Sequence, residues 1–330
     1  MAKNNDKINQ LPARFRERGL EIYGSYFWQQ IEQTFVARPV TFRVNTIKNT
    51  RKEVMDELST GGFKLKSVPW YRDAFILFNK KQGELEQTEL YKQGKIYMQS
   101  LASMTPVLVL APVPGDKVLD LTAAPGSKTS QIAGFMEMKG ELVANDNDEI
   151  RFQKLKHNLE LLGVTPPLAP PQSGGDSKFC TVYNENGHKL CQQFPDHFDK
   201  ILLDAPCSAE ARINLSERRT FGFWNERNIK DHAFVQRQLL CGAWASLKSG
   251  GTLVYSTCTF APEENEVQID KFLESFPDAK IVEIKIDGLH KTESVLQWKG
   301  KDLNKQIKKC WRIMPTTEVE GFFVCKILKK

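Results

Sequence analysis

The sequence lacks the patterns that mark membrane, secreted and low-complexity proteins. No window approaches the roughly 20 apolar residues of a membrane span, and residues 1–10 lack the apolar core of a signal peptide. The 330 residues contain no internal repeat, and 41% hydrophobic and 26% charged residues are ordinary for a globular protein. We therefore expect a cytoplasmic protein without a membrane partner.

Patterns for metal sites and disulfides are also missing. The seven cysteines are odd in number and form no C-x-x-C pair, and the five histidines show no ligand spacing. We therefore expect reduced thiols and no metal ion. The net charge of +6 is mild for a nucleic-acid-binding module, so charge alone does not identify a partner.

The length predicts a core of about 200 residues and a smaller attached module. In the C-terminal part, predicted strands and helices alternate, which is typical of an α/β fold with a parallel sheet covered on both faces. The strands are expected at 117–121, 141–144, 198–203 and 251–255, and the helices at 128–136 and 150–162.

The N-terminal part reads as a small α+β module. Its strands are expected at 42–46, 63–68 and 74–77, and its helix at 50–58. We interpret this pattern as an RRM-like module. The sequence thus predicts an RNA-positioning module over residues 1–95 and a Rossmann-like catalytic domain over residues 96–330.

Two cysteines follow predicted strands of the catalytic domain. Cys207 lies in the sequence DAPCS after the strand at 198–203, and Cys258 lies in YSTCT after the strand at 251–255. Open α/β sheets bind ligands in the crevice at the carboxyl ends of their strands. We therefore expect both thiols at the ligand-binding edge.

Two thiols at this edge fit covalent chemistry on a pyrimidine. Cytosine C5 is a poor nucleophile, and a thiolate that adds to C6 pushes electron density onto C5. A second thiol can assist the later elimination. The alternative is that both cysteines are ordinary buried residues, because free cysteine is commonly buried.

A turn of small residues follows the first predicted strand. Residues 120–129 read DLTAAPGSKT, and such a turn lets backbone N–H groups approach a ligand closely. The turn lacks the spacing of a dinucleotide site or a phosphate loop. We expect a carboxylate-bearing ligand such as S-adenosylmethionine, with a plain strand–helix turn as the alternative. Asp146, after the second strand, is a candidate for the ribose hydroxyls or for a helix N-cap.

Taken together, these motifs resemble the Nop/Sun family of S-adenosylmethionine-dependent RNA cytosine-5 methyltransferases. The resemblance rests on residues 120–129, 204–208, 255–266 and 320–324 and extends over about residues 11–329. It implies a Rossmann-like class I methyltransferase sheet with helices on both faces. It also implies S-adenosylmethionine as the cofactor and RNA, either rRNA or tRNA, as the partner.

The resemblance implies roles for individual residues. Cys258 would be the nucleophile, and Cys207 would assist release of the product. Asp204 would contact the N3 and amino edge of the cytosine, which requires a shared proton, and Lys128 would lie beside the cofactor and the base. The implied cofactor-binding residues are Thr122, Ala123, Ala124, Pro125, Gly126, Ser127, Lys128, Asp146, Asp176 and Asp204, with Asp176 near the adenine.

The sequence departs from the family pattern at three places. Thr122 and Ser127 replace the first Cys and the second Gly of Cys-Ala-Ala-Pro-Gly-Gly-Lys, and both changes are small and polar. The family's Pro-Cys-Ser-Gly-x-Gly reads PCSAEA at 206–211, which predicts a stiffer backbone and an added charge from Glu210 at the target base. A proline-rich segment at 164–176, expected to be a surface loop, replaces the short strand before Asp176.

Two further segments receive simpler interpretations. Glu263, Glu264 and Glu266 open the helix after Cys258, where acidic side chains interact favourably with the helix dipole. Trp224, in the segment after Cys207, is expected to pack in a core rather than to stack on an RNA base.

Two rival functions remain open. A DNA cytosine-5 methyltransferase would use Cys207 as its nucleophile, but YSTCT and the N-terminal module argue against it. An RNA-binding assembly factor with weak or lost catalysis is suggested by residues 209–211 and opposed by Asp204, Lys128 and both thiols. We expect a monomer that acts on a single-stranded or flipped-out cytidine.

Overall fold

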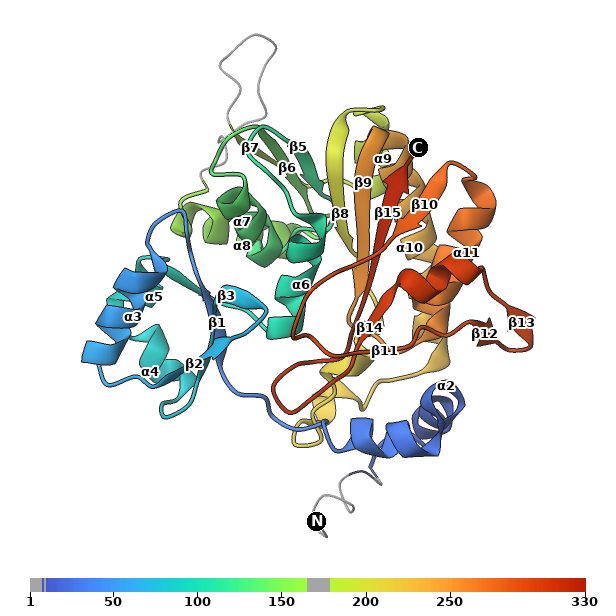
Figure 1. Ribbon diagram of the computed structural model, residues 1–330, viewed down its shortest axis with the longest axis horizontal. Coiled ribbons are helices and arrows are strands. Elements are labelled where there is room, and N and C mark those ends of the chain that lie inside the picture. Colours follow the sequence, from blue (N-terminus) through green and yellow to red (C-terminus); the bar gives the residue numbers. More distant parts are fainter. Residues whose placement is uncertain (1–7, 9, 165–178) are drawn as a thin grey trace.

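The computed structural model describes Ile8, residues 10–164 and residues 179–330, and these residues form two main sheets of different kinds and a separate two-stranded hairpin (Figure 1). The smaller sheet has four strands, and the larger sheet has nine. Asp176 and nearly all of the proline-rich segment lie outside the described residues. No helix among the described residues is both long enough and apolar enough to cross a membrane.

The four-stranded sheet belongs to the N-terminal module. Its elements, in chain order, are β1 (Thr41–Val44), α3 (Arg51–Thr60), β2 (Leu65–Val68), β3 (Tyr71–Leu77), α4 (Gln82–Glu86), α5 (Glu89–Lys92) and β4 (Ile96–Met98). The spatial order is β2-β3-β1-β4, and all neighbours are antiparallel. This β-α-β-β-α-β order around a four-stranded sheet confirms the predicted RRM-like module.

The helix α3 begins at a capping box. The Thr50 hydroxyl accepts a hydrogen bond from the Glu53 backbone N–H, and the Glu53 carboxylate accepts one from the Thr50 N–H. Such reciprocal bonds satisfy two backbone donors that a helix start otherwise leaves unpaired. The predicted helix therefore begins at its expected position.

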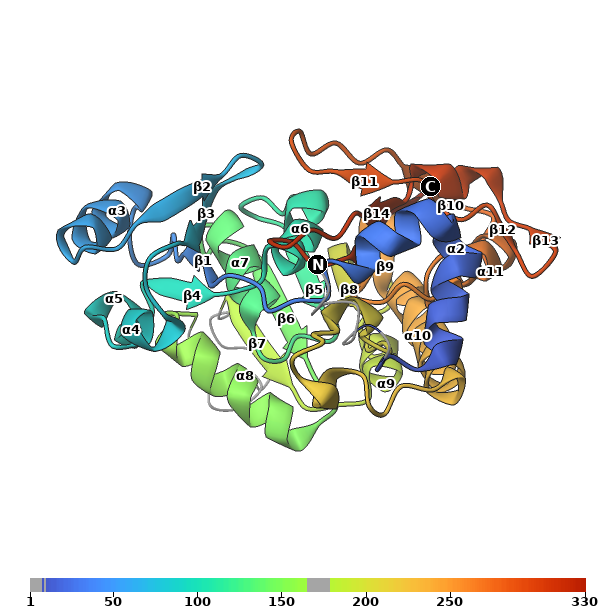
Figure 2. The same ribbon diagram turned by 90° about the horizontal axis from the view of Figure 1, so that it is seen from below.

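The helix α2 (Ala13–Glu32) packs on the catalytic domain and lies away from the four-stranded sheet (Figures 1 and 2). Its Phe15 and Trp28 join Phe221 and Phe260 in one aromatic cluster. Gly19 is required for this packing, because a Cβ at that position would lie 2.2 Å from the Trp28 ring. The cluster brings α2 beside the segments that follow the two predicted active thiols.

The nine-stranded sheet forms the catalytic domain. Its central strands are β5 (Lys117–Asp120), β6 (Glu141–Asn145), β7 (Cys180–Tyr183), β8 (Phe198–Asp204) and β9 (Leu247–Thr257). These five strands are parallel, in the order β9-β8-β5-β6-β7. The chain moves outward from β5 to one side and later continues on the other, so the topological switch point lies at β5.

Antiparallel strands complete the sheet next to β9. They are β15 (Phe322–Lys329), β14 (Trp311–Ile313), β11 (Lys291–Thr292) and β10 (Ala279–Val282), with β10 and β14 both paired to β15. A separate hairpin consists of β12 (Gln297–Trp298) and β13 (Lys301–Asp302). Four 3-10 helices are η1 (Glu210–Arg212), η2 (Arg218–Thr220), η3 (Pro262–Glu264) and η4 (Lys305–Lys309).

Helices cover both faces of the large sheet (Figure 1). One core cluster joins strand residues such as Val118 and Leu142 to α6 (Leu101–Leu110), α7 (Ser127–Phe135) and α8 (Glu149–Leu161). The other joins their neighbours Leu119 and Val143 to α9 (Gly187–Gln192), α10 (Glu226–Ser246) and α11 (Glu266–Ser275). Because successive strand residues face opposite sides, both faces must be apolar. The predicted Rossmann-like α/β architecture is confirmed.

Candidate active site

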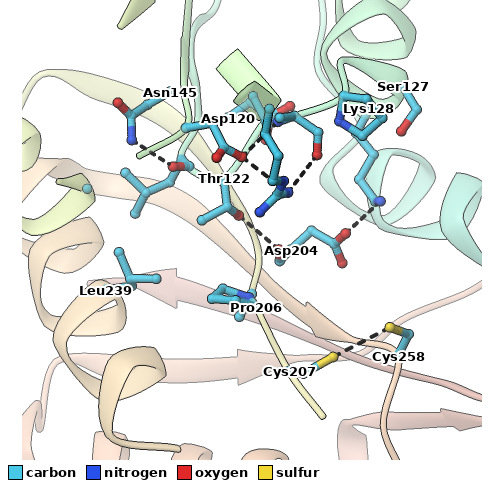
Figure 3. A pocket seen from close by; sticks show the side chains of 18 of the residues that line it. Asp120, Thr122, Ser127, Lys128, Asn145, Asp204, Pro206, Cys207, Leu239 and Cys258 are labelled. Carbon is cyan, nitrogen blue, oxygen red and sulfur yellow. Dashed lines mark hydrogen bonds and ion pairs between the residues drawn. The ribbon is translucent and has the colours of Figure 1, made fainter. Parts of the chain in front are cut away.

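A cavity of about 610 Å³ opens at the carboxyl ends of the parallel strands, beside the switch point at β5 (Figure 3). Residues predicted from the sequence line much of it: Thr122, Ala123, Ala124, Pro125, Ser127, Lys128, Asp146, Asp204, Cys207 and Cys258. The carboxyl ends of parallel strands meet at one edge, so residues far apart in sequence gather there. Asp176 lies outside the described residues, and its role stays a prediction.

The turn after β5 requires glycine at one position. Gly126 has φ of 100° and precedes α7, and a Cβ there would lie 3.1 Å from the Leu155 Cδ1 atom of α8. The turn is held by hydrogen bonds from the Ala123 N–H to the Asn145 carbonyl and from the Gly126 N–H to the Ala123 carbonyl, at 2.7 and 2.8 Å. Gly126 therefore shapes the turn while its neighbours line the cavity.

Asp120, at the end of β5, has one carboxylate oxygen that lacks a protein partner. Its Oδ2 atom accepts a hydrogen bond from the Thr129 hydroxyl at 2.7 Å, whereas no described residue bonds to the buried Oδ1 atom. Burial raises the pKa of Asp120 to about 7. A ligand with a hydrogen-bond donor would satisfy this oxygen.

Asp146 follows β6 and faces the turn. Its Oδ2 atom accepts a hydrogen bond from the Ala124 N–H and pairs with Arg151 Nη2, both at 3.2 Å. Its burial raises its pKa. The N-cap of α8 is Asp148, whose side chain accepts from the Arg151 N–H at 2.8 Å, so the helix-cap alternative for Asp146 is wrong.

Asp204 and Lys128 form an ion pair inside the cavity (Figure 3). The Lys128 Nζ atom lies 2.6 Å from Asp204 Oδ2 and donates a hydrogen bond to the Ser103 hydroxyl at 2.7 Å. The Asp204 Oδ1 atom accepts from the Ser256 hydroxyl at 2.7 Å, and its carbonyl oxygen accepts from Thr122 at 2.8 Å. These contacts fix the orientation of the Asp204 carboxylate relative to the turn.

The two thiols lie directly against each other. The Sγ atoms of Cys207 and Cys258 are 3.4 Å apart, and the two side chains point toward each other in Figure 3. This hydrogen bond lowers the pKa of Cys258, and the positive charges of Arg212 and Lys128 add to the effect, while burial and Asp204 oppose it. The same bond raises the pKa of Cys207. Cys258 is therefore the better candidate for the thiolate.

The loop after Cys207 differs from its predicted form. Ala209 has φ of 55°, a left-handed conformation that favours glycine. Glu210 does not line the cavity but is buried, where its carboxylate accepts hydrogen bonds from Trp224 Nε1, the Thr259 hydroxyl and the Phe260 N–H at 2.8, 3.0 and 3.1 Å. The expectation of an added charge at the target base is therefore wrong, because three donors hold the buried Glu210 carboxylate outside the cavity lining.

Trp224 packs against other aromatic side chains. Its ring is half-buried and lies 5.4 Å, between centroids, from Phe15 in the aromatic cluster of α2. The indole N–H is bonded to Glu210. The prediction that Trp224 packs in a core is confirmed.

Some site residues were missed by the sequence analysis. Ser256 lies at the carboxyl end of β9, where it donates to Asp204, and its place near the end of a predicted strand could have identified it. Ser103 and Arg212 have no such signal, because they enter from α6 and from the end of η1. These two residues also line a smaller cavity of about 50 Å³ next to Cys258.

Two parts of the chain match known families. Residues 107–328 match the family described as 16S rRNA methyltransferase RsmB/F, and residues 11–101 match the N-terminal domain of 16S rRNA methyltransferase RsmF. The chain belongs to the RsmB/F methyltransferase family. This membership confirms the predicted Nop/Sun relationship and identifies the large sheet as a class I methyltransferase sheet.

Individual relatives agree with the family. The tRNA (cytosine(49)-C(5))-methyltransferase of Pyrococcus abyssi is 34% identical, over 92% of this chain and 91% of its own length. The Ribosomal RNA small subunit methyltransferase F of Vibrio campbellii is also 34% identical, over 88% of this chain but 56% of its own length. The 25S rRNA (cytosine-C(5))-methyltransferase nop2 of Schizosaccharomyces pombe is 30% identical, and this chain spans about half of it.

A solved structure has the same architecture from end to end. The methyltransferase homolog protein of Pyrococcus horikoshii superposes with a TM-score of 0.83 at 31% sequence identity, and all of both chains are covered. The RRM-like sheet, the methyltransferase sheet and their arrangement are therefore common to both proteins.

Proposed function

We propose that this protein transfers a methyl group from S-adenosylmethionine to C5 of a cytosine in RNA. The observation that carries the proposal is the pair of thiols at 3.4 Å, in one cavity with the Asp204–Lys128 pair and the turn after β5. The RNA cytosine-5 methyltransferases among the relatives support it. The protein would act as a monomer in the cytoplasm on tRNA or rRNA.

We call the part of the cavity formed by Asp120, residues 122–125 and Asp146 the cofactor half. These residues fit S-adenosylmethionine. The backbone of residues 122–125 would face its methionine end, and Asp146 would accept hydrogen bonds from its ribose hydroxyls. The unpartnered Asp120 Oδ1 atom would accept from its amino group. When bound, the cofactor supplies an electrophilic methyl group. Asp176 remains the proposed contact to the adenine.

We call the part of the cavity formed by Lys128, Asp204, Cys207 and Cys258 the thiol half. These residues would activate the target cytosine. The Cys258 thiolate adds to C6, and the C5–C6 double-bond electrons move onto C5, which then takes the methyl group. Asp204 holds the N3 edge through a shared proton, and Lys128 fixes the Asp204 carboxylate. Loss of the C5 proton to a base expels the Cys258 sulfur and restores the double bond. Cys207 lies next to the leaving sulfur and assists its departure.

The rival functions have less support. A Cys207 nucleophile, as in a DNA cytosine-5 methyltransferase, is disfavoured because the positive charges of Arg212 and Lys128 favour the thiolate form of Cys258. An assembly factor without catalysis was suggested by residues 209–211, but Glu210 does not line the cavity and is bonded to Trp224. Neither rival accounts for a nucleophile pair beside the Asp204–Lys128 pair.

Two cysteine variants test the proposal. The purified protein and its Cys258→Ala and Cys207→Ala variants are incubated with S-adenosylmethionine and total cellular RNA, and 5-methylcytosine and covalent protein–RNA adducts are measured. We expect no product from Cys258→Ala and an accumulated adduct from Cys207→Ala. Absence of 5-methylcytosine with the wild-type protein on every RNA would refute the proposal. Methylation mapped in cells lacking the protein then separates tRNA from rRNA.

A further inference from the structure

The acidic residues in the segment after Cys258 make specific contacts in addition to the predicted interaction with the helix dipole. Glu263 binds Arg18 of α2 at 2.6 Å, and Glu266 binds Arg312 of β14 through two contacts of 2.6 Å. Asn265 accepts from the Thr257 hydroxyl at 2.5 Å and donates to the Thr259 carbonyl at 3.0 Å. These three residues therefore connect the end of β9 to other parts of the fold, and the simple dipole interpretation is incomplete.

Glu264, which lies between Glu263 and Asn265, holds the loop that carries Cys207. Its Oε2 atom accepts hydrogen bonds from the Ser208 N–H at 3.0 Å and from Gln236 Nε2 at 2.9 Å, and its Oε1 atom contacts the Ser208 hydroxyl. Gln236 also donates to the Pro206 carbonyl at 2.8 Å. The fully buried Glu264 side chain thus fixes the residues on both sides of Cys207.

A bridge of hydroxyl groups joins the two thiol loops. The Ser208 hydroxyl lies 2.7 Å from the Thr259 hydroxyl, which lies 3.0 Å from Glu210 Oε2. Ser208 directly follows Cys207, and Thr259 directly follows Cys258. The chain of contacts Glu264–Ser208–Thr259–Glu210, here called the carboxyl–hydroxyl chain, therefore begins and ends at a buried acid.

Counting hydrogens in this chain shows that it needs one extra proton. The chain has three oxygen–oxygen contacts, but its two hydroxyl groups supply only two hydrogens if both carboxyl groups are ionised. One contact at hydrogen-bond distance would then lack a hydrogen. A proton on Glu264 or Glu210 provides the third hydrogen and satisfies all three contacts.

We infer that Glu264 and Glu210 share one proton and that the carboxyl–hydroxyl chain positions the two thiols for catalysis. This inference rests on the proposed function and makes Glu264 a positioning residue, since it acts through Ser208 and Thr259. Burial raises the pKa of Glu264 to about 7 and also raises the pKa of Glu210, and each effect favours the shared proton.

The surrounding charges set the direction of the pH dependence. Three titratable groups face Glu264, namely Glu210 from η1, Cys207 from the loop after β8, and Tyr255 of β9. The Tyr255 hydroxyl donates to the Glu264 carbonyl, and α10 contributes the neutral Gln236. Arg18 of α2 acts on Glu210. As pH rises through about 7, Glu264 loses its proton, the third hydrogen is lost and the thiol loops separate. Activity should then decline.

Substitution of Glu264 by Gln and Ala tests this inference. In Glu264→Gln the amide NH₂ donates permanently to Ser208 Oγ, while the amide oxygen still accepts from the Ser208 N–H and Gln236. Glu264→Ala removes these bonds. We expect Glu264→Gln to keep the wild-type kcat below pH 7 and to lack the decline above it. We expect Glu264→Ala to lose about 100-fold in kcat, because small misplacements of reacting groups cost that much.

The matched control is Glu263→Gln. Despite burial, the hydrogen bond from Arg18 lowers the pKa of Glu263 to about 2, so this neighbour is ionised throughout and should leave the pH profile unchanged. The inference is overturned if Glu264→Gln keeps the decline above pH 7, or if it loses as much activity as Glu264→Ala.

An infrared measurement without substrate separates this inference from the proposed function. A protonated carboxyl group has a C=O stretching band that a carboxylate lacks. The difference spectrum between wild type and Glu264→Gln should show this band below pH 7 and lose it above, and the spectrum for Glu263→Gln should not. Absence of the band overturns the shared proton even if methyl transfer occurs. Failure of methyl transfer with the band present refutes only the function.

Discussion

The cofactor half and the thiol half of the cavity are held together in different ways. The turn after β5 and Asp146 follow two adjacent strands, and the Ala124 N–H of the turn donates to the Asp146 carboxylate at 3.2 Å while the Ala123 N–H donates to the Asn145 carbonyl at 2.7 Å. The thiols depend on buried side chains from η1, η3 and α10, including Glu210, Glu264 and Gln236. Strand topology alone therefore gathers the cofactor half, whereas the thiol half needs a buried polar network and should respond more strongly to pH and to substitution.

The largest predicted effect is a loss of methyl transfer without a loss of cofactor affinity, which distinguishes the thiol half from the cofactor half. Cys258→Ala should reduce methyl transfer by about 10⁴-fold or more, because the variant lacks the nucleophile. Its affinity for S-adenosylmethionine should stay unchanged, because Cys258 lies in the other half. Transfer of labelled methyl groups and calorimetric cofactor titration measure the two quantities. Cys241→Ala, a free thiol that does not line the cavity, is the control.

The second prediction removes a contact from the cofactor half. Asp146→Ala should weaken cofactor binding about 10- to 100-fold, because bonds to a charged acceptor contribute about 1.5–3 kcal/mol. The kcat at saturating cofactor should change little. Asp148→Ala, which removes the N-cap of α8, should cost about 1 kcal/mol of stability without loss of affinity. Equal affinity losses in both variants would contradict the assignment of Asp146.

The third prediction concerns the stability of the thiol half. The folded state raises the pKa of Glu264 from 4.5 to about 7, so stability falls as pH rises across this interval and stays reduced above it. Glu264→Gln should therefore be more stable than wild type at pH 8 by about 1–3 kcal/mol, and the difference should vanish below pH 4.5.

Glu263, the neighbour of Glu264, should show the opposite pH dependence of stability. Glu263 has its pKa lowered to about 2, so it contributes stability above pH 4.5 that is lost as pH falls through 2. Glu263→Gln should therefore destabilise the protein at pH 8. Denaturant unfolding of both variants at several pH values tests the two signs, and a stabilising Glu263→Gln would contradict the account.

The smallest predicted effect compares backbone strain in the two halves. Ala209 holds a left-handed φ of 55°, so Ala209→Gly should stabilise the protein by about 1 kcal/mol. Ser127 is the first residue of α7, so Ser127→Gly, which also moves the sequence toward the family pattern, should bring no such gain. Thermal unfolding of both variants is the measurement. A larger gain from Ser127→Gly would reverse the comparison.

The same contrast explains what the sequence could predict. Strand ends placed Asp204, Cys207 and Cys258 at one edge, because parallel strands end together, and the family resemblance added Lys128. Periodicity predicted three strands and one helix of the RRM-like module and the two-faced sheet, but not α4, α5 or β4.

The contacts of Glu210 and Glu264 could not be predicted from the neighbouring sequence. The direction of Glu210 depends on Trp224, Thr259 and Phe260, which lie on other segments. The partners of Glu264 likewise come from the Cys207 loop and from α10. Periodicity within one element does not indicate such contacts, so these residues were misplaced or given only a helix-dipole role. The division of the chain at residue 95 stays a prediction.

The central claim is that Cys258 attacks the target cytosine, and a trapped adduct tests it most directly. RNA transcripts of tRNA and rRNA that contain 5-fluorocytidine would be incubated with the protein and S-adenosylmethionine. After methyl transfer the fluorine at C5 cannot leave as a proton does, so the sulfur–C6 bond persists. Peptide mapping of the adduct should identify Cys258. An adduct on Cys207, or no adduct on any of these RNAs, would contradict the account.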